Sequence, residues 1–254
     1  MKDANIKDVI WSELRFFQEK LSELSVSKTI ALGSGLCVSV GSYSENWVYL
    51  PEPVDSEDYV SDAVMFFDTL GETFVWPLYE GSGEVLERGG VNYVGDLMAM
   101  SIDPKDMDTS HANERATCER VASLEEARIW ADVAWRSFGG DDNVPEDYCR
   151  FIEAVFRESK DLSLHLARLD GEPAGTIMLT HQPDVVGAYY GGTLPNMRRK
   201  GIAAATMKEA SRIAGTRRIV HQSTPMGLKF YQSVGFKELF AIPVYSTDKE
   251  ILLS

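Results

Sequence analysis

The part of the sequence that most constrains the fold is residues 185–206, where a short apolar segment leads through a glycine-containing turn into a helix. Residues 185–190 (VVGAYY) are apolar enough for a buried strand, and two glycines and a proline follow them. A helix is predicted to open at residues 198–201 and to end at Gly215. One of its faces is formed at the spacing i, i+4, i+8 and i+11 by Ile202, Thr206, Ala210 and Ile213.

The first residues of this predicted helix, Arg198, Arg199 and Lys200, are all cationic. A helix N-terminus has unpaired N–H groups and a partial positive charge, so acidic residues are normally favoured there. Cations at this position are expected where backbone amides and basic side chains bind a phosphate together. Gly201 and Ala203 would let the backbone approach such an anion closely. The alternative is a solvated basic turn without a ligand.

The composition is that of a soluble globular protein, with 254 residues, 44% hydrophobic and 25% charged, and it allows one large domain or two smaller ones. An 18-residue apolar run is absent and the N-terminal segment is charged, so we expect no membrane span, no signal peptide and a cytoplasmic location. Three widely spaced cysteines and four scattered histidines predict neither a disulfide framework nor a metal site.

The net charge of −14 is distributed unevenly along the chain. Residues 1–110 contain 7 Lys and Arg and 20 Asp and Glu, a net charge of −13, whereas residues 111–254 contain 18 and 19, a net charge of −1. This asymmetry favours two units with different surfaces and argues against nucleic acid or an anionic membrane as a partner. The acidic half would tolerate a small or cationic molecule as a substrate. The alternative is that its charge only aids solubility.

The pattern of apolar stripes and breaks predicts two domains joined by a linker. Residues 1–102 are predicted to form an α/β domain, and residues 115–254 are predicted to form the second domain. Residues 103–114 between them are polar and aperiodic, which predicts a linker. In the first domain we expect helices over 5–25, 56–70 and 84–88, and strands over 35–50 (two, around a turn at 41–46), 74–78 and 91–100. Gly81-Ser82-Gly83 is interpreted as a helix-starting turn, because it has acidic neighbours and no basic residue.

In the second domain the predicted order of elements is β, α, α, β, β, β, α, β, α, β between residues 117 and 244. Ser123 and Glu126 fit a capping box at the start of the first helix. Asp170-Gly171 predicts a tight hairpin turn between the second and third strands.

Residues 117–244 resemble the GCN5-related N-acetyltransferase (GNAT) family. Residues 198–203 (RRKGIA) fit the family's Gln/Arg-x-x-Gly-x-Gly/Ala loop between a strand and a helix, and residues 231–236 (YQSVGF) fit its Tyr-x-x-x-Gly-Phe motif about 30 residues later. The resemblance implies an α/β (α+β) fold with a mixed, mostly antiparallel twisted sheet flanked by helices. The smaller first domain partly echoes the same order of elements, so it is either a degenerate GNAT-like domain or an unrelated α/β module.

This resemblance implies an N-acetyltransferase that transfers the acetyl group of acetyl-CoA directly to a primary amine of a small molecule, amino acid or peptide. Acetyl-CoA would be the only cofactor, used as a co-substrate without a metal. The strand before the loop would pair with the pantetheine arm, and the loop amides would bind the pyrophosphate. The residues in these roles are Gly192, Thr193, Leu194, Arg198, Arg199, Lys200, Gly201, Ile202, Ala203 and Ala204.

The resemblance also suggests the catalytic residues. Tyr231 matches the tyrosine that protonates the leaving thiolate in the family, and a backbone N–H near Leu194 would polarise the thioester carbonyl. The strand before the loop has no glutamate to act as general base, so His221 is the first choice; the alternative is that His221 is a hydrogen-bonded histidine of the core without a catalytic role. The other polar residues considered are Tyr189, Tyr190, His181 and Ser223.

Two residues depart from the usual family pattern. Ala204 stands where many members have Ser or Thr, and Thr224 replaces a frequent Asn. Neither motif contains a cysteine, which disfavours a covalent acyl-enzyme. The alternative function is a non-catalytic acyl-CoA-binding regulatory or sensor protein, and a monomer and a homodimer are both compatible with the sequence.

Overall fold

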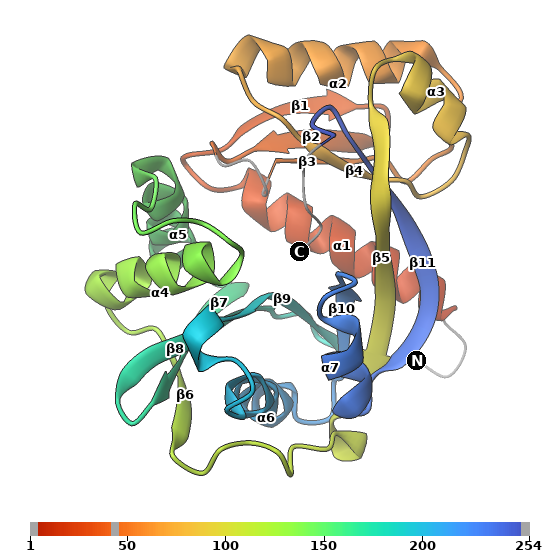
Figure 1. Ribbon diagram of the computed structural model, residues 1–254. Helices are drawn as coiled ribbons and strands as arrows, with labels where there is room; N and C mark the ends of the chain where they lie inside the picture. Colours follow the sequence, from red (N-terminus) through yellow and green to blue (C-terminus); the bar gives the residue numbers. More distant parts are fainter. Residues whose placement is uncertain (1–4, 42–45, 250–254) are drawn as a thin grey trace. The chain divides into compact units, whose positions relative to one another are not determined.

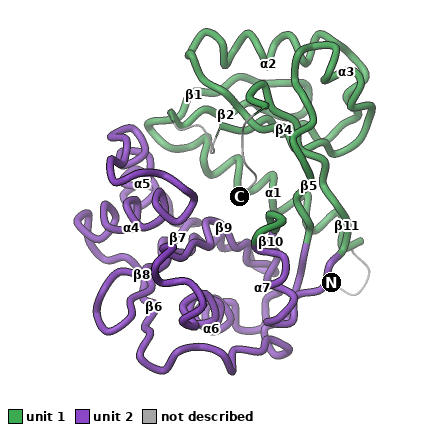
Figure 2. Tube along the Cα trace, viewed as in Figure 1, with its two compact units in different colours: residues 1–99, 223–226, 239–254 green, residues 100–222, 227–238 purple. Residues whose placement is uncertain are grey.

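The computed structural model describes residues 5–41 and 46–249 and groups the chain into two compact units (Figure 2). Unit 1 comprises residues 1–99, 223–226 and 239–254, and unit 2 comprises residues 100–222 and 227–238. Within the described residues, no helix is both long enough and apolar enough to cross a membrane.

Unit 1 is a mixed sheet with three helices (Figure 1). Its strands follow the order β1-β2-β3-β4-β11-β5, with β1–β2, β2–β3 and β4–β11 antiparallel and β3–β4 parallel. The elements are α1 (Ile6–Ser22), β1 (Lys28–Leu32), β2 (Gly35–Ser39), β3 (Trp47–Tyr49), α2 (Glu57–Leu70), β4 (Val75–Pro77), α3 (Gly83–Arg88), β5 (Asn92–Ile102) and β11 (Lys237–Ser246).

The helices of unit 1 begin and end where the sequence predicts. At the start of α2, the Ser56 hydroxyl accepts a hydrogen bond from the Asp58 amide, and Gly71 ends the helix with φ 70°. Ser82 caps α3 in the same way, so Gly81-Ser82-Gly83 is a helix-starting turn. Sequence analysis missed β1, which has mostly exposed side chains and is defined by its pairing with β2. Of the turn predicted at 41–46, residues 42–45 lie outside the described part.

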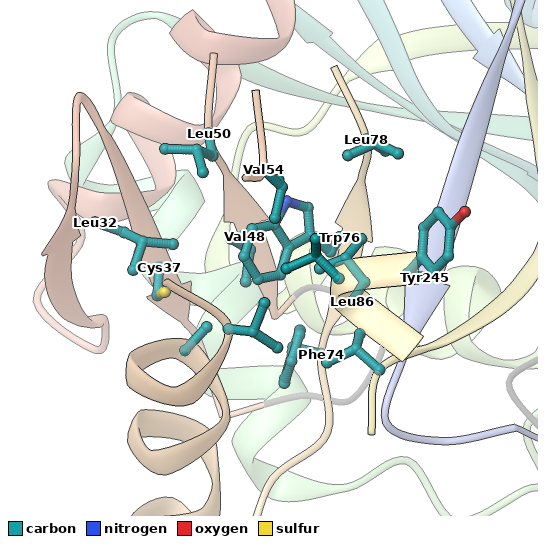
Figure 3. Close-up of a cluster of buried hydrophobic side chains, with 14 of the residues drawn as sticks. Leu32, Cys37, Val48, Leu50, Val54, Phe74, Trp76, Leu78, Leu86 and Tyr245 are labelled. Carbon is teal, nitrogen blue, oxygen red and sulfur yellow. The ribbon is translucent and has the colours of Figure 1, made fainter. Parts of the chain in front are cut away.

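Trp76 of β4 lies at the centre of the buried apolar core of unit 1 (Figure 3). Phe67 from α2 and Phe74 from the segment before β4 stack with their ring centroids 4.6 Å apart. Both side chains are fully buried, and α3 contributes Leu86 to the same core. The core therefore holds α2 and α3 against the strands, largely through non-directional apolar burial.

Unit 2 is a sheet with the strand order β10-β9-β8-β7-β6, and Figure 1 shows α4 and α5 on one face and α6 on the other. All neighbouring strands are antiparallel except β9 and β10, which are parallel. The elements are η2 (Pro104–Asp106), β6 (Ala116–Arg120), α4 (Leu124–Ser137), α5 (Glu146–Glu158), β7 (Leu162–Leu169), β8 (Glu172–Thr180), β9 (Val185–Thr193), η3 (Pro195–Met197), α6 (Ile202–Ala214), β10 (Arg218–Ser223) and α7 (Leu228–Ser233).

This architecture confirms the predicted mixed, mostly antiparallel sheet flanked by helices. The predicted hairpin turn is also confirmed, because Asp170 and Gly171 join β7 to β8 with φ of 53° and 88°. Ser123 caps α4 by accepting from the Glu126 amide, while the Glu126 carboxylate accepts from the amide of Ala122.

The compact units differ from the predicted domains in four places, of which residues 100–102, now in unit 2, and residues 223–226, now in unit 1, are short. Residues 103–114, predicted as a linker, belong to unit 2, because they form hydrogen bonds with α6 and with the turn before it. Residues 239–254, predicted in the second domain, belong to unit 1, because β11 pairs with β4. A division into two independently folding domains stays a prediction.

Replacing Phe67 by Ala should lower the free energy of unfolding by about 3–5 kcal/mol, because it leaves a cavity against Phe74 and Trp76. Met65 lies on the same helix but is 62% exposed, so Met65→Ala should change stability by less than about 0.5 kcal/mol. Urea unfolding of both variants checks this. Equal losses would mean that Phe67 does not contribute to the core as described.

Candidate functional site

The predicted anion-binding turn lies between η3 and α6 in unit 2 (Figure 1). The helix begins at Ile202 rather than at Arg198, so the three cations precede it instead of forming its first turn. The reason is the backbone: Arg199 and Gly201 both have positive φ, 60° and 76°, which a right-handed helix cannot contain. Gly201 adopts this conformation without cost, whereas Arg199 is strained there.

The backbone amides of this turn have no hydrogen-bond acceptor. Among the described residues, none accepts from the N–H groups of residues 199–204, and α6 has no side-chain N-cap. Arg199 and Lys200 are exposed, and the segment 195–206 contains no acidic side chain. A run of free amides beside two exposed cations is suited to a polyanion.

The carbonyl oxygens of Lys200 and Gly201 are both hydrogen-bonded, and that of Gly201 accepts from the Ala205 N–H of α6 at 3.1 Å as well as from Asn113. The side-chain amide of Asn113 donates to the Lys200 carbonyl oxygen at 3.0 Å, and the Asn113 backbone N–H donates to that of Gly201 at 3.4 Å. A Cβ on Gly201 would lie 2.6 Å from the His111 oxygen, so this position requires glycine for space as well as for conformation.

Arg198 binds backbone oxygens rather than projecting freely. Its guanidinium donates to the carbonyl oxygens of Ser137, at the end of α4, and of Thr193, at the end of β9, at 3.0 and 3.3 Å. It thereby ties α4 to the strand that precedes the turn. Leu194 is also engaged, since its N–H donates to the Ala174 oxygen.

The parallel pairing of β9 with β10 stops in the middle of both strands. The last registered pair is Gly187 with Val220, although β9 continues to Thr193 and β10 to Ser223. At the next position the Nδ1 atom of His221 lies 2.7 Å from the Ala188 carbonyl oxygen. The oxygen can only accept, so Nδ1 carries the proton and the neutral ring leaves Nε2 unprotonated.

Beyond this point β9 bulges. Thr176 of β8 pairs with Gly192 and Met178 with Tyr189, so two residues of β9 oppose one of β8, and Tyr190 has φ 51°. The Thr176 hydroxyl fixes the bulge by donating to the Tyr190 oxygen at 3.0 Å. The bulge displaces Gly191 from the regular register of the strand.

Tyr231 of α7 lies at the end of the paired segment. Its ring contacts that of His221, with the centroids 4.0 Å apart, and a Cβ on Gly191 would lie 2.7 Å from its hydroxyl oxygen. Burial raises the pKa of Tyr231 well above its usual value, so the phenol stays protonated at neutral pH. Burial also lowers the pKa of His221 to about 4, so its ring is neutral there. The pair therefore combines a proton donor with an unprotonated nitrogen.

The other polar residues considered for proton transfer lie in different surroundings. The imidazole of His181 bonds the Ser163 hydroxyl at 2.7 Å, and the same hydroxyl lies 2.9 Å from Nε2 of His165. Tyr190 makes an edge contact with Trp130, and Ser223 donates to the Thr224 oxygen. The structure thus brings His221 into contact with the Tyr231 ring.

A separate cavity of about 460 Å³ lies among residues of β6, β7 and α6. It is lined by Cys118, Glu119, Arg120, Ser163, His165, His181, Glu209, Arg212 and Ile213. None of these residues belongs to the turn or to the Tyr231 motif. Among the described residues no group of three or more His, Cys, Asp or Glu side chains could hold a metal ion.

The predicted site residues thus fall on adjoining elements of unit 2. Gly192 and Thr193 end β9, Leu194 precedes η3, residues 198–201 form the turn, and residues 202–204 form the first turn of α6. Sequence analysis missed Asn113, which stands in an aperiodic segment 87 residues before Lys200 and carries no motif. An Asn 87 residues away can be assigned to the turn only once the chain is folded.

Comparison with known proteins identifies this arrangement as an acyltransferase fold. Residues 160–238 match the family model of the acetyltransferase (GNAT) domain, and both motifs lie inside the matched segment. Residues 160–238 of unit 2 are therefore similar to a GNAT domain, as the resemblance implied. No significant sequence match was found among curated proteins.

Solved structures share the fold over both units. A GCN5-related N-acetyltransferase from Kribbella flavida superposes with a TM-score of 0.68 at 17% identity, covering 94% of each chain. One from Sphaerobacter thermophilus gives 0.53 at 15% identity, covering 87% of this chain and 75% of the other. A tandem GNAT protein from the clavulanic acid biosynthesis pathway gives 0.57 at 10% identity, covering 88% and 83%. At these identities the likeness establishes the fold.

The buried histidines should make stability depend on pH. Burial lowers the pKa of His165, like that of His221, to about 4, so the unfolded chain binds protons below pH 6.5 that the folded chain excludes. The free energy of unfolding should be fully retained above pH 6.5 and fall towards pH 4, by about 1.4 kcal/mol per pH unit for each histidine. Urea unfolding between pH 7 and pH 4.5 measures this slope.

His165→Gln removes one of the histidines whose pKa burial lowers, so it should lower the slope by about 1.4 kcal/mol per pH unit and leave the part that His221 and His181 contribute. Identical slopes for the wild type and His165→Gln would contradict the assignment.

Proposed function

We propose that this protein is an N-acetyltransferase that transfers the acetyl group of acetyl-CoA directly to a primary amine of a small molecule, amino acid or peptide. The observation that carries the proposal is the run of unpartnered amides at residues 199–204, within a GNAT domain. Such a row of amides can donate together to the oxygens of one anionic ligand.

The turn fits the pyrophosphate of CoA chemically. Its amides would donate to the phosphate oxygens, Arg199 and Lys200 would add charge, and the absence of carboxylates leaves nothing to repel the ligand. Ala203 and Ala204 contribute backbone donors without bulk. Arg198 would act indirectly, by holding the ends of β9 and α4.

The pantetheine arm would lie along β9 beyond Gly187, where the strand no longer pairs with β10. Gly192 and Thr193 would line this segment. Because the Leu194 N–H already donates to Ala174, the donor that polarises the thioester carbonyl has to come from an earlier residue of the strand.

In the proposed reaction the amine nitrogen forms a bond to the thioester carbon and the carbon–sulfur bond breaks. The Tyr231 hydroxyl donates its proton to the departing sulfur, and Nε2 of His221 accepts the proton that the amine loses. The low pKa of His221 keeps Nε2 free to accept, although it makes the ring a weak base, so the enzyme would depend mainly on positioning and on binding the neutral amine.

Unit 1 would be a degenerate GNAT-like domain that does not bind CoA. Its turns before α2 and α3 contain acidic residues and no cation, in contrast with the turn before α6. The structural likeness to a tandem GNAT protein supports this interpretation. We propose that unit 1 contributes to acceptor selection, that the protein acts in the cytoplasm as a monomer or homodimer, and that neither nucleic acid nor a membrane is its partner.

The function is tested with the wild type, Tyr231→Phe and Tyr93→Phe, incubated with acetyl-CoA and a panel of primary amines while free thiol is measured. Tyr231→Phe should lower kcat by about 10²-fold or more and leave the Kd for CoA nearly unchanged, because it loses only the proton donor. Tyr93→Phe removes an exposed hydroxyl of unit 1 and should behave as the wild type. CoA binding without turnover of any amine would favour the non-catalytic acyl-CoA sensor instead.

The variant His221→Asn distinguishes the proposed role of His221 as a base from its structural role as the hydrogen-bond donor to Ala188. The Asn side-chain amide can still donate to the Ala188 oxygen, but it provides no basic nitrogen in place of Nε2. If His221 accepts the proton, kcat should fall by about 10²-fold while KM for acetyl-CoA and the melting temperature stay close to those of the wild type. An unchanged kcat would remove His221 from the reaction.

A further inference from the structure

Residues 103–113, here called the strap, run from the end of β5 towards β6 and contact several elements of unit 2. At the beginning of the strap, the Asp103 carboxylate pairs with Arg218 of β10 at 3.5 Å. The next residue, Pro104, accepts a hydrogen bond from the Ser211 hydroxyl of α6 at 3.3 Å. The strap is therefore fixed to two of the elements that surround the site.

The middle of the strap contacts the glycine of the Tyr231 motif. The Asp108 N–H donates to the Val234 carbonyl oxygen at 3.0 Å. Gly235 has φ 100°, and a Cβ there would lie 2.9 Å from the Asp106 oxygen. The glycine that follows the Tyr231 helix is thus a point of close backbone contact with the strap.

The end of the strap contacts the glycine of the anion-binding turn. Asn113 donates to the carbonyl oxygens of Lys200 and Gly201, and its side-chain oxygen accepts from the Arg115 N–H at 2.9 Å. Both the nitrogen donor and the oxygen acceptor of the Asn113 side chain are thereby hydrogen-bonded, which holds the side chain in place. The two motifs, which stand apart in sequence, meet the same eleven-residue segment through their glycines.

We propose that Asn113 is a positioning residue for the CoA pyrophosphate: by holding the Lys200 carbonyl oxygen on one side of the turn, its side chain directs the following amide, that of Gly201, to the other. This inference rests on the proposed function, because it assigns the ligand of that amide to CoA.

The planar trans peptide links the direction of each carbonyl oxygen to that of the next N–H. In a trans peptide the carbonyl oxygen and the N–H of the next residue point in opposite directions, and the described residues contain no cis peptide. Fixing the Lys200 oxygen towards Asn113 therefore orients the Gly201 N–H away from it. The Gly201 oxygen accepts from the Ala205 N–H at 3.1 Å and from the Asn113 backbone N–H at 3.4 Å, so the orientation of the Ile202 N–H does not depend on the Asn113 side chain.

Two variants test this role. Asn113→Asp keeps the shape and the acceptor for Arg115 but loses the donor to Lys200, and Asn113→Ala loses the donor without adding charge. Both should bind CoA about tenfold more weakly, because the turn loses the bond that orients the Gly201 amide. The kcat/KM for S-acetylpantetheine, a thioester without the pyrophosphate, should stay at the wild-type value.

Asn143→Asp, an isosteric change in the exposed turn between α4 and α5, is the matched control and should bind CoA as the wild type does. Calorimetry with CoA and thiol release from both thioesters give the readouts, and thermal unfolding verifies that each variant is folded. An unchanged Kd in both Asn113 variants, or an equal loss with S-acetylpantetheine, would overturn the positioning role. A wild type that does not bind CoA would overturn the proposed function itself, and the role of Asn113 with it.

Discussion

The site of unit 2 depends on a reversal of the backbone at residues 199–201, where two positive φ angles separate the direction of the carbonyl groups from that of the amides. A regular helix start would leave only its first few amides unpaired and would place acidic side chains beside them. Here Asn113 donates to the carbonyl oxygens of Lys200 and Gly201, and the Gly201 oxygen also accepts from the Ala205 N–H. Within the described part of the chain, the amides of residues 199–204 have no acceptor. The strain at Arg199 is offset by this anchoring and is consistent with a turn preorganised for an anion.

A second constraint acts on the neighbouring strands. The His221 side chain takes the Ala188 carbonyl oxygen, which a continuing parallel ladder would otherwise offer to the backbone of β10. The pairing ends at that point, the β9 bulge follows, and the Tyr231 hydroxyl reaches Gly191. One buried imidazole thereby ends the strand pairing and contacts the tyrosine ring, so its structural and chemical contributions are separable only by a substitution that keeps its donor.

Much of the fold was predictable because its signals are local. Helix caps at Ser56 and Ser123, the Asp170-Gly171 turn and the spacing of both motifs are read from neighbouring residues, and the structure bears them out. What the sequence did not indicate depends on contacts between distant residues: the exposed strand β1, which is defined by pairing, and Asn113, whose partner is 87 residues away. The start of α6 was misplaced because helical periodicity does not register two positive φ angles.

The position of β11 has a consequence for how the chain acquires its structure during synthesis. In the strand order of unit 1, β11 lies between β4 and β5, although it is made about 135 residues after β5 ends. Until residues 239–246 leave the ribosome, β4 and β5 lack the strand that separates them, while the strands of unit 2 from β6 to β10 are already available to pair. Unit 1, most of whose strands are made before unit 2, is thus completed after it, and the exposed edges of its strands must stay free of mispairing until β11 is made.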